Sequence, residues 1–138
     1  MTYIVDTNVL SEMRKRQKAH PGVRRWAASV DARDLYLSTI TVYESELGIL
    51  RLGRKDQRQA SVLRAWFHTR ILPAFADRIL PVDSAVALRC AGLHVPDPCS
   101  LRDSLIAATA LEHGMTIVTR NVRDFERTAV QLVNPWES

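Results

Sequence analysis

The sequence predicts an α/β fold, in which helices cover a mostly parallel central sheet of about five strands. Three observations support this prediction. Short apolar runs rich in β-branched residues alternate with longer segments of helical periodicity. The first run, residues 3–5, is apolar throughout, as is typical of a strand buried on both faces of a parallel sheet. No repeat or linker divides the 138 residues, so we expect a single domain, 1–138.

The expected strands are short apolar runs bounded by polar or turn-forming residues. In chain order they are residues 3–5, 35–38, 78–82, 116–119 and 130–133. Pro81 lies in the third run and cannot donate a hydrogen bond to a neighbouring strand, so we expect that run at an edge of the sheet. The helices between strands imply right-handed crossover connections.

The expected helices are segments whose apolar residues recur every three or four positions. They are residues 9–18, 20–29, 41–52, 56–72, 84–92 and 101–113, with a helical turn at 121–127. Pro21 fits the first turn of the second helix, and Gly53 and Gly114 fit the ends of the third and the last. Pro73 is expected to end the longest helix. The large apolar residues of that helix belong to the core, or else to a dimer surface.

The charge of the chain is mildly basic. The net charge is +4 and the isoelectric point about 9.5, with positive residues grouped between positions 14 and 25 and between 51 and 70. Such groups form either a solvated helix surface or a positively charged surface that binds a partner. That partner would be a nucleic acid, through its phosphates, or an acidic protein.

The composition also predicts where the protein works. No apolar run approaches the roughly 20 residues of a membrane span, and the first strand leaves no room for a signal peptide before it. Cys90 and Cys99 have no paired-motif spacing, which favours a reduced chain. We therefore expect a cytoplasmic protein with no membrane partner.

Four acidic residues stand where a strand or loop gives way to a helix. They are Asp6, Glu44, Asp103 and Asp124. Each could simply cap its helix, because acids are favoured in the first turn and three of them follow a Ser, Thr or Asn by three positions. In a parallel sheet, however, helices that follow strands begin at one edge, so these acids would converge.

Convergent carboxylates repel one another. Two unit charges about 5 Å apart at an effective dielectric of 20 cost roughly 3 kcal/mol, so several such pairs require protonation or a cation. Oxygen ligands without nearby His or Cys favour Mg²⁺ or Mn²⁺ over zinc, and such ions commonly partner substrate phosphates. The acids therefore predict a metal-dependent site for phosphoryl transfer or phosphodiester cleavage.

Other kinds of site are not supported by the sequence. The four histidines have no ligand-pair spacing, and no nucleophile-elbow motif is present. The five glycines form no phosphate-binding loop, which argues against a nucleotide-fold NTPase or dehydrogenase.

Four blocks of this sequence, in order, resemble the PIN-domain family, and within it the FitB-like branch of VapC toxins from bacterial type II toxin–antitoxin pairs. The blocks are residues 4–10 (IVDTNVL), 38–44 (STITVYE, with Gly48 following), 102–110 (RDSLIAATA) and 117–125 (IVTRNVRDF). The resemblance covers nearly the whole chain. It implies a PIN-like three-layer α/β/α sandwich and an Mg²⁺- or Mn²⁺-dependent endoribonuclease, whose acids hold one or two metal ions that activate water for attack on RNA.

The resemblance also assigns roles to individual residues. Asp6, Glu44 and Asp103 match the family's metal ligands. The fourth acid falls in the last block, where Asn121 stands at the position that is Asp in many relatives, so Asp124 is the better carboxylate candidate. Thr7, Asn8, Thr119 and Asn121 would orient ligands or water.

One departure from the family pattern concerns the second block, where Glu44-Ser45 replaces the usual acid–aliphatic pair and Glu46-Leu47 follows. Thr41 and Gly48 set the register, so Glu44 is preferred. Successive helical residues point about 100° apart, so Glu44 and Glu46 cannot face one metal ion equally well.

The implied partners are an RNA substrate, such as tRNA or another structured RNA, and a cognate antitoxin. The resemblance implies a homodimer, a heterotetramer or larger complex with the antitoxin, and an antitoxin tail that blocks the site, with an arginine reaching the carboxylates. Two alternatives remain at this point. One is a PIN nuclease for RNA processing or DNA flaps that is not a toxin, and the other is a non-catalytic module that binds RNA or a partner.

Overall fold

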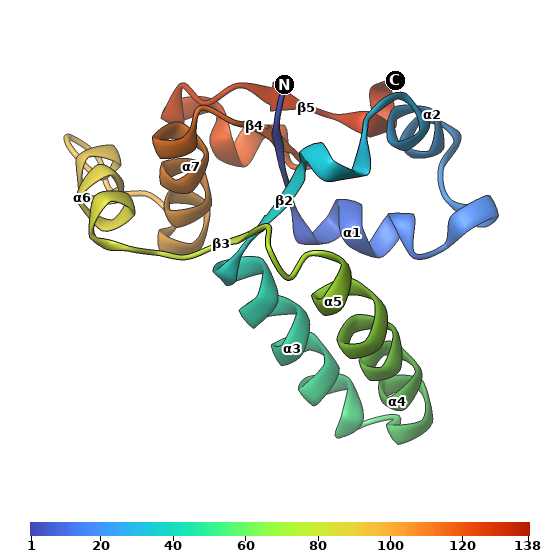
Figure 1. Cartoon of the computed structure of the whole chain (residues 1–138). Helices are drawn as coiled ribbons and strands as arrows, with labels where there is room; N and C mark the ends of the chain where they lie inside the picture. Colours follow the sequence, from blue (N-terminus) through green and yellow to red (C-terminus); the bar gives the residue numbers. More distant parts are fainter.

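The computed structural model describes residues 1–138 as three layers around a five-stranded sheet (Figure 1). The strands are β1 (Tyr3–Val5), β2 (Leu35–Ser38), β3 (Ile79–Leu80), β4 (Thr116–Val118) and β5 (Leu132–Val133). Their order is β3-β2-β1-β4-β5, and every neighbouring pair is parallel. The predicted α/β class and the edge position of the third strand are confirmed.

Seven helices and several shorter turns surround the sheet. The helices are α1 (Thr7–Met13), α2 (Pro21–Ser29), α3 (Thr39–Gly53), α4 (Gln57–Trp66), α5 (Leu72–Ala74), α6 (Ser84–Leu93) and α7 (Leu101–His113). The 3₁₀ turns are Arg16–Lys18, Ala32–Asp34, Val122–Thr128 and Pro135–Glu137, and a π-helical turn, Phe67–Ile71, joins α4 to α5. No helix combines the length and apolarity that a membrane crossing requires.

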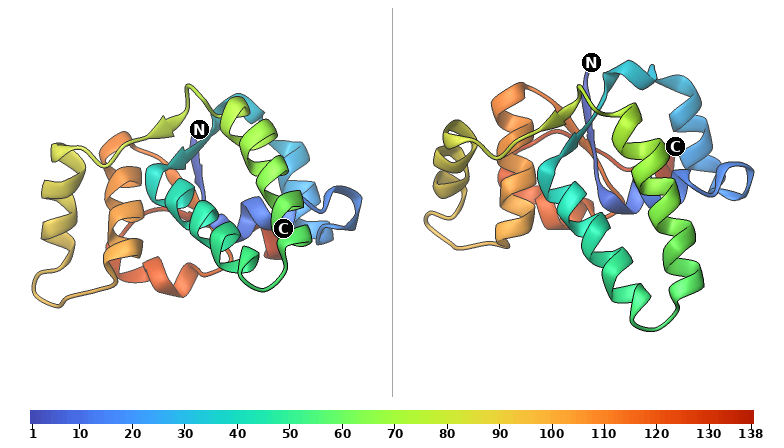
Figure 2. Two further views of the ribbon diagram at one scale, coloured as in Figure 1. Left: turned by 90° about the horizontal axis from the view of Figure 1, so that it is seen from below. Right: turned by 60° about the horizontal axis from the view of Figure 1, so that its bottom comes forward.

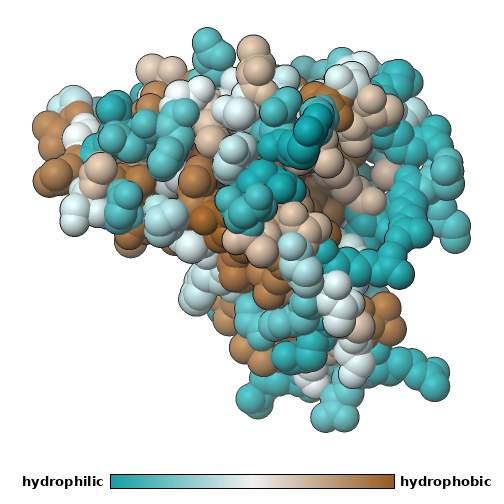
Figure 3. Space-filling view, viewed as in Figure 1, coloured by the Kyte–Doolittle hydropathy of each residue, from teal (hydrophilic) through white to brown (hydrophobic).

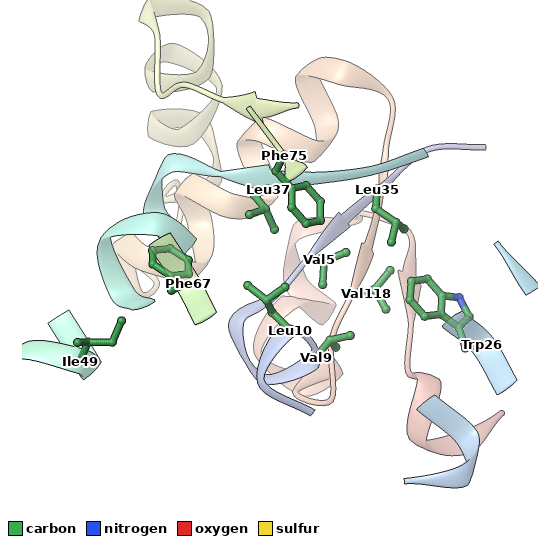
Figure 4. Packing of buried hydrophobic residues seen from close by; sticks show 10 residues of the cluster. All are labelled: Val5, Val9, Leu10, Trp26, Leu35, Leu37, Ile49, Phe67, Phe75 and Val118. Atoms are coloured by element: carbon green, nitrogen blue, oxygen red, sulfur yellow. The ribbon is translucent and has the colours of Figure 1, made fainter. Parts of the chain in front are cut away.

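The alternation of side chains along each strand divides the core into two halves. Val5, Leu35, Leu37 and Val118 point to the face covered by α1, α2 and the α3–α4 hairpin (Figure 4). Ile4 and Ile117 point to the opposite face, where they pack against α7 and the 3₁₀ turn that follows β4. Both faces are therefore buried, which explains why the strands lack the polar alternation of an exposed sheet.

The α3–α4 hairpin projects from this body. In Figures 1 and 2, α3 runs beside α4 and α5 in every view, and the tip of the hairpin lies away from the sheet. Helix α6 packs on the outside of α7 through Val86 and Cys90, which contact Ala108. Hydrophilic side chains cover the tip of the hairpin and the segment between α1 and α2 (Figure 3).

The two chain ends are brought together by α2. A Cβ atom on Gly22 would lie only 2.5 Å from the carbonyl oxygen of Pro135, so the absence of a side chain lets the C-terminal turn pack directly on this helix. The C-terminus accordingly lies beside α2 in Figure 1.

The first predicted helix, 9–18, is wrong at its C-terminal end. Helix α1 begins at Thr7, ends at Met13, and is followed by a turn in which Arg16 has a left-handed backbone (φ 53°). Four cations within residues 14–18 repel one another along a helix, which disfavours its continuation. Glu12 stabilises the turn, because its carboxylate accepts hydrogen bonds from the Lys15 ammonium and the His20 amide, each at 2.9 Å.

The other differences concern helix and strand ends. The helix predicted from position 41 begins at Thr39, because the Ser38 hydroxyl accepts a hydrogen bond from the Ile40 amide at 3.0 Å. The long helix runs past Pro73 to Ala74, and the π turn shifts its hydrogen-bond register just before the proline. Only Ile79–Leu80 of the run 78–82 pairs with β2, because Pro81 has no amide to donate.

Candidate active site

The site lies at the carboxyl end of the sheet, where the central strands β1 and β4 pass into their following segments. Asp6 comes directly after β1 and Thr119 directly after β4, and the Asp6 amide donates to the Val118 carbonyl at 2.9 Å. Helices α3 and α7 bring Glu44 and Asp103 to the same place. Three of the four predicted acids are therefore adjacent in space.

Asp6 is fully buried and held on both carboxylate oxygens. Its Oδ1 accepts a hydrogen bond from the Thr7 amide at 2.8 Å, which caps α1. Its Oδ2 accepts one from the Thr119 hydroxyl at 2.8 Å and lies 3.5 Å from the Asn8 amide nitrogen. The Asp6 carboxylate therefore both caps α1 and belongs to the group of convergent acids.

Glu44 lies more than one turn inside α3 and reaches the site by its length. The Thr7 hydroxyl donates to its Oε1 at 2.9 Å. Glu46 points elsewhere, since its carboxylate contacts the His68 ring nitrogen at 2.8 Å and the Arg64 guanidinium at 3.6 Å. The placement therefore agrees with the choice of Glu44 over Glu46.

Asp103 lies in the first turn of α7. Its own amide donates to the Ser100 hydroxyl at 3.3 Å, so the capping pattern seen in the sequence exists. Because Ser100 caps the helix, the Asp103 carboxylate is not needed as a cap. It turns toward the other acids instead.

Asp124 and Asn121 lie at the rim of the site. Both line an open pocket of about 450 Å³ that has no hydrophobic residue in its wall. The remaining wall residues are Thr7, Asn8, Glu44, Arg102 and Asp103. Neither the Asp124 carboxylate nor the Asn121 side-chain amide hydrogen-bonds to another group of the protein, so both are free to bind a ligand.

A somewhat larger cavity lies elsewhere. It measures about 490 Å³ and is formed by the end of α1, the turn after it and α2, with no carboxylate in its wall. The polar pocket at the sheet edge is therefore the better candidate for chemistry.

The sequence did not predict the group at the centre of the acids, the guanidinium of Arg102. Its Nε donates to Glu44 Oε2 at 2.6 Å and its Nη2 to Glu44 Oε1 at 2.8 Å. Nη2 also donates to Asp6 Oδ1 at 2.6 Å, and Nη1 donates to Asp103 Oδ1 at 2.6 Å. Arg102 directly precedes Asp103 in the third block, but sequence adjacency alone does not show which way its side chain points.

The electrostatics of Arg102 follow from these contacts. Burial by itself lowers the pKa of the guanidinium, but the hydrogen bonds to Glu44 and the charge of Asp6 outweigh it and raise the pKa above its ordinary value. Three carboxylates and one guanidinium leave two negative charges at the site.

The residues fit a hard divalent cation by their chemistry. The donor set consists of carboxylate oxygens with hydroxyl and amide groups beside them, and three carboxylates already converge on one cationic group. With the guanidinium among them, no three acidic, His or Cys side chains are close enough to share one metal ion. The donor chemistry of the site therefore suits a metal, while the present spacing is that of an arginine site.

Thr119→Val is expected to weaken the site and the fold together. The buried Thr119 hydroxyl donates to Asp6 and accepts hydrogen bonds from the Asn121 amide at 3.0 Å and from Asn8 at 3.4 Å. Leaving these partners unpaired costs about 1–3 kcal/mol of unfolding free energy. We expect urea denaturation to show this loss. Thr116→Val serves as the control, because the Thr116 hydroxyl is also buried but donates to the side-chain oxygen of Gln131 at the opposite end of β4, so its loss should not alter the site.

Comparisons with known proteins point in one direction. The PIN domain family matches residues 3–131. Toxin FitB of Neisseria gonorrhoeae is 37% identical over 96% of this chain and 97% of its own length, and VapC ribonuclease Y4jK of Sinorhizobium fredii is 33% identical over 97% of each. The crystal structure of FitAcB from Neisseria gonorrhoeae superposes with a TM-score of 0.89 at 36% identity, covering 99% of this chain and 100% of that one.

Proposed function

Because this chain belongs to the PIN-domain family, we propose that it is a metal-dependent endoribonuclease and the toxin of a toxin–antitoxin pair. The observation that supports this most directly is the meeting of Asp6, Glu44 and Asp103 around one cationic group at the carboxyl end of the sheet. Residues 1–138 would form a single domain for this activity.

Asp6, Glu44 and Asp103 would hold Mg²⁺ or Mn²⁺, with Asp124 completing the set from the rim. When bound, such an ion supplies Lewis-acid activation of water and offsets the charge of the scissile phosphate. The chain's own groups keep the carboxylates in place. The Thr7 and Thr119 hydroxyls donate to Glu44 and Asp6, so these two carboxylates are oriented before a ligand binds.

The rim offers contacts for an RNA backbone. A neighbouring pocket of about 280 Å³ shares Asp103 and Asp124 with the polar pocket and also contains Arg123 and Arg127. These two cations would bind phosphates on one side of the cleaved bond, with an affinity that falls as salt rises. The unpaired Asn121 amide can donate to and accept from RNA.

The partners follow from the proposed role. A relative that is 37% identical over nearly the whole chain is named a toxin, so we propose a cognate antitoxin, a homodimer, and a heterotetramer or larger complex with that antitoxin. Growth arrest on expression, relieved by co-expression of the adjacent gene, would distinguish this role from that of a PIN nuclease in RNA processing.

The test is cleavage of a tRNA pool by the purified chain with Mg²⁺ or Mn²⁺. We expect EDTA to abolish cleavage and added Mn²⁺ to restore it. Asp103→Asn should cleave more slowly than the wild type by a factor of about 100 or more. Asp77→Asn makes the same change at an exposed aspartate that pairs only with its neighbour Arg78, and it should cleave at the wild-type rate. Cleavage that persists in EDTA, or full activity of Asp103→Asn, would contradict the proposal.

A further inference from the structure

Arg102 occupies a place that is unusual for a basic residue of the proposed nuclease. It comes from the same chain, and even the same helix turn, as Asp103, yet its guanidinium lies between that acid and the two acids on other elements. Arg102 donates four hydrogen bonds to the three acids, and Thr7 donates one to Glu44. All five are 2.9 Å or shorter. The arginine is therefore an integral part of the carboxylate cluster.

We propose that Arg102 is a built-in competitor of the divalent metal ion: its guanidinium takes the cation position among Asp6, Glu44 and Asp103, and it must swing out before the metal binds. This inference rests on the proposed function, because it concerns the same site. It adds a regulatory residue that sets how much free metal the site requires.

Geometry shows why the two cations exclude each other. Nη2 of Arg102 lies 2.6 Å from Asp6 Oδ1 and 2.8 Å from Glu44 Oε1, so this nitrogen fills the space between those two oxygens. Mg²⁺ holds oxygen ligands at about 2.0–2.1 Å, and an ion shared by the same two oxygens would overlap the nitrogen. The width of the guanidinium also explains why no three acids are close enough to share a metal ion while it is present.

Charge shows why the arginine does not neutralise the site permanently. Two negative charges remain while Arg102 is paired with the acids, and once it has left, a divalent cation offsets two of the three carboxylate charges where the arginine offsets only one. Fork-shaped guanidinium pairing with Glu44 is strong but uses one positive charge only. The site is therefore stable without metal and still attracts it.

The surroundings allow the arginine to leave while the acids stay. The Arg102 side chain is 31% exposed and lines the open polar pocket, whereas the Asp6 side chain is 0% exposed. Asp6 keeps its hydrogen bonds from Thr7 and Thr119, and Glu44 keeps the one from Thr7, whatever Arg102 does. Rotation of this one flexible side chain vacates the position, and the carboxylates then move closer together to share the ion.

The decisive experiment measures metal binding in the absence of RNA. Isothermal titration of Mn²⁺ into Arg102→Met, which keeps an unbranched apolar stem without the charged guanidinium, should give a Kd about ten- to a hundredfold lower than that of the wild type. Arg58→Met is the matched control, because Arg58 is exposed on α4 and has no side-chain partner. It should bind Mn²⁺ as the wild type does.

Two outcomes would overturn the inference in different ways. Equal Mn²⁺ affinity of Arg102→Met and Arg58→Met, together with metal-dependent cleavage by the wild type, would reject the competition and leave the proposed function standing. Absence of Mn²⁺ binding and of cleavage in every variant would reject both.

A second measurement uses the wild-type chain and does not depend on the folding of a variant. In ¹H–¹⁵N spectra the Arg102 Nε–H should be protected from exchange without metal, because it is hydrogen-bonded to Glu44. Saturation with Mg²⁺ should remove that protection. An Nε–H signal that stays protected in the Mg²⁺-saturated chain would overturn the proposal.

Discussion

Asp6→Asn is expected to lower metal-dependent RNA cleavage at least about 100-fold while the chain stays folded. Asn keeps a side-chain oxygen that can accept from the Thr7 amide, and Asn and Asp are nearly equal as N-caps, so α1 remains capped. What is lost is the negative charge of the carboxylate, which pairs with Arg102 and would bind the metal. Rates on a defined RNA with Mn²⁺, measured beside circular dichroism, check both parts.

The matched control for this variant is Asp83→Asn. Asp83 caps α6 as Asp6 caps α1, its Oδ1 accepting from the Val86 amide at 2.9 Å, but it does not contact the acid cluster. It should retain full activity. Equal rates for the two variants would mean that Asp6 serves only as a cap, and the proposed active site would then be wrong.

Phe67→Ala is expected to cause the largest loss of stability, about 3–5 kcal/mol of unfolding free energy. The Phe67 side chain is fully buried in the cluster that joins the helical hairpin to the sheet face (Figure 4). Its removal leaves a cavity in a segment that already has a π turn and so has little freedom to collapse. Urea denaturation followed by tryptophan fluorescence would measure the change.

Val62→Ala is the comparison for that experiment. Val62 lies on α4 of the same hairpin but is 57% exposed, so its truncation should change the unfolding free energy by no more than about 0.5 kcal/mol. A loss at Phe67 as small as that at Val62 would show that the hairpin does not depend on this contact with the body.

The layers of the fold could be predicted from the sequence because a parallel sheet is covered by helices on both faces. Its strands are therefore apolar throughout, and its helices are apolar on one face only. The sequence did not separate Val62 from Phe67, which share one helical pattern although one is exposed and the other buried. Which of the two side chains is buried depends on which part of the α3–α4 hairpin packs against the sheet and which part projects into solvent. The extent of the first helix was also wrong, because charge repulsion over residues 14–18 outweighed helical periodicity.

The site was predictable to the level of its acids. A parallel sheet places the residues after β1 and β4 at one edge, and α7 runs back from that edge to the start of β4, so the convergence of Asp6 with the first turn of α7 and its Asp103 follows from topology. Capping and convergence, which compete as explanations in the sequence, coexist in Asp6. Arg102 was missed because the direction of a long side chain depends on which partners are near it in space.

The placement of β1 in the middle of the sheet has a consequence for synthesis of the protein. Asp6 leaves the ribosome early, but β1 pairs with β4 only after residues up to 118 exist, and Asp6 meets Thr119 across 113 positions. Such distant contacts form late and slowly. The nascent chain therefore has no assembled acid cluster while it is translated, and a toxic activity that depends on this cluster would arise only once nearly the whole polypeptide has emerged.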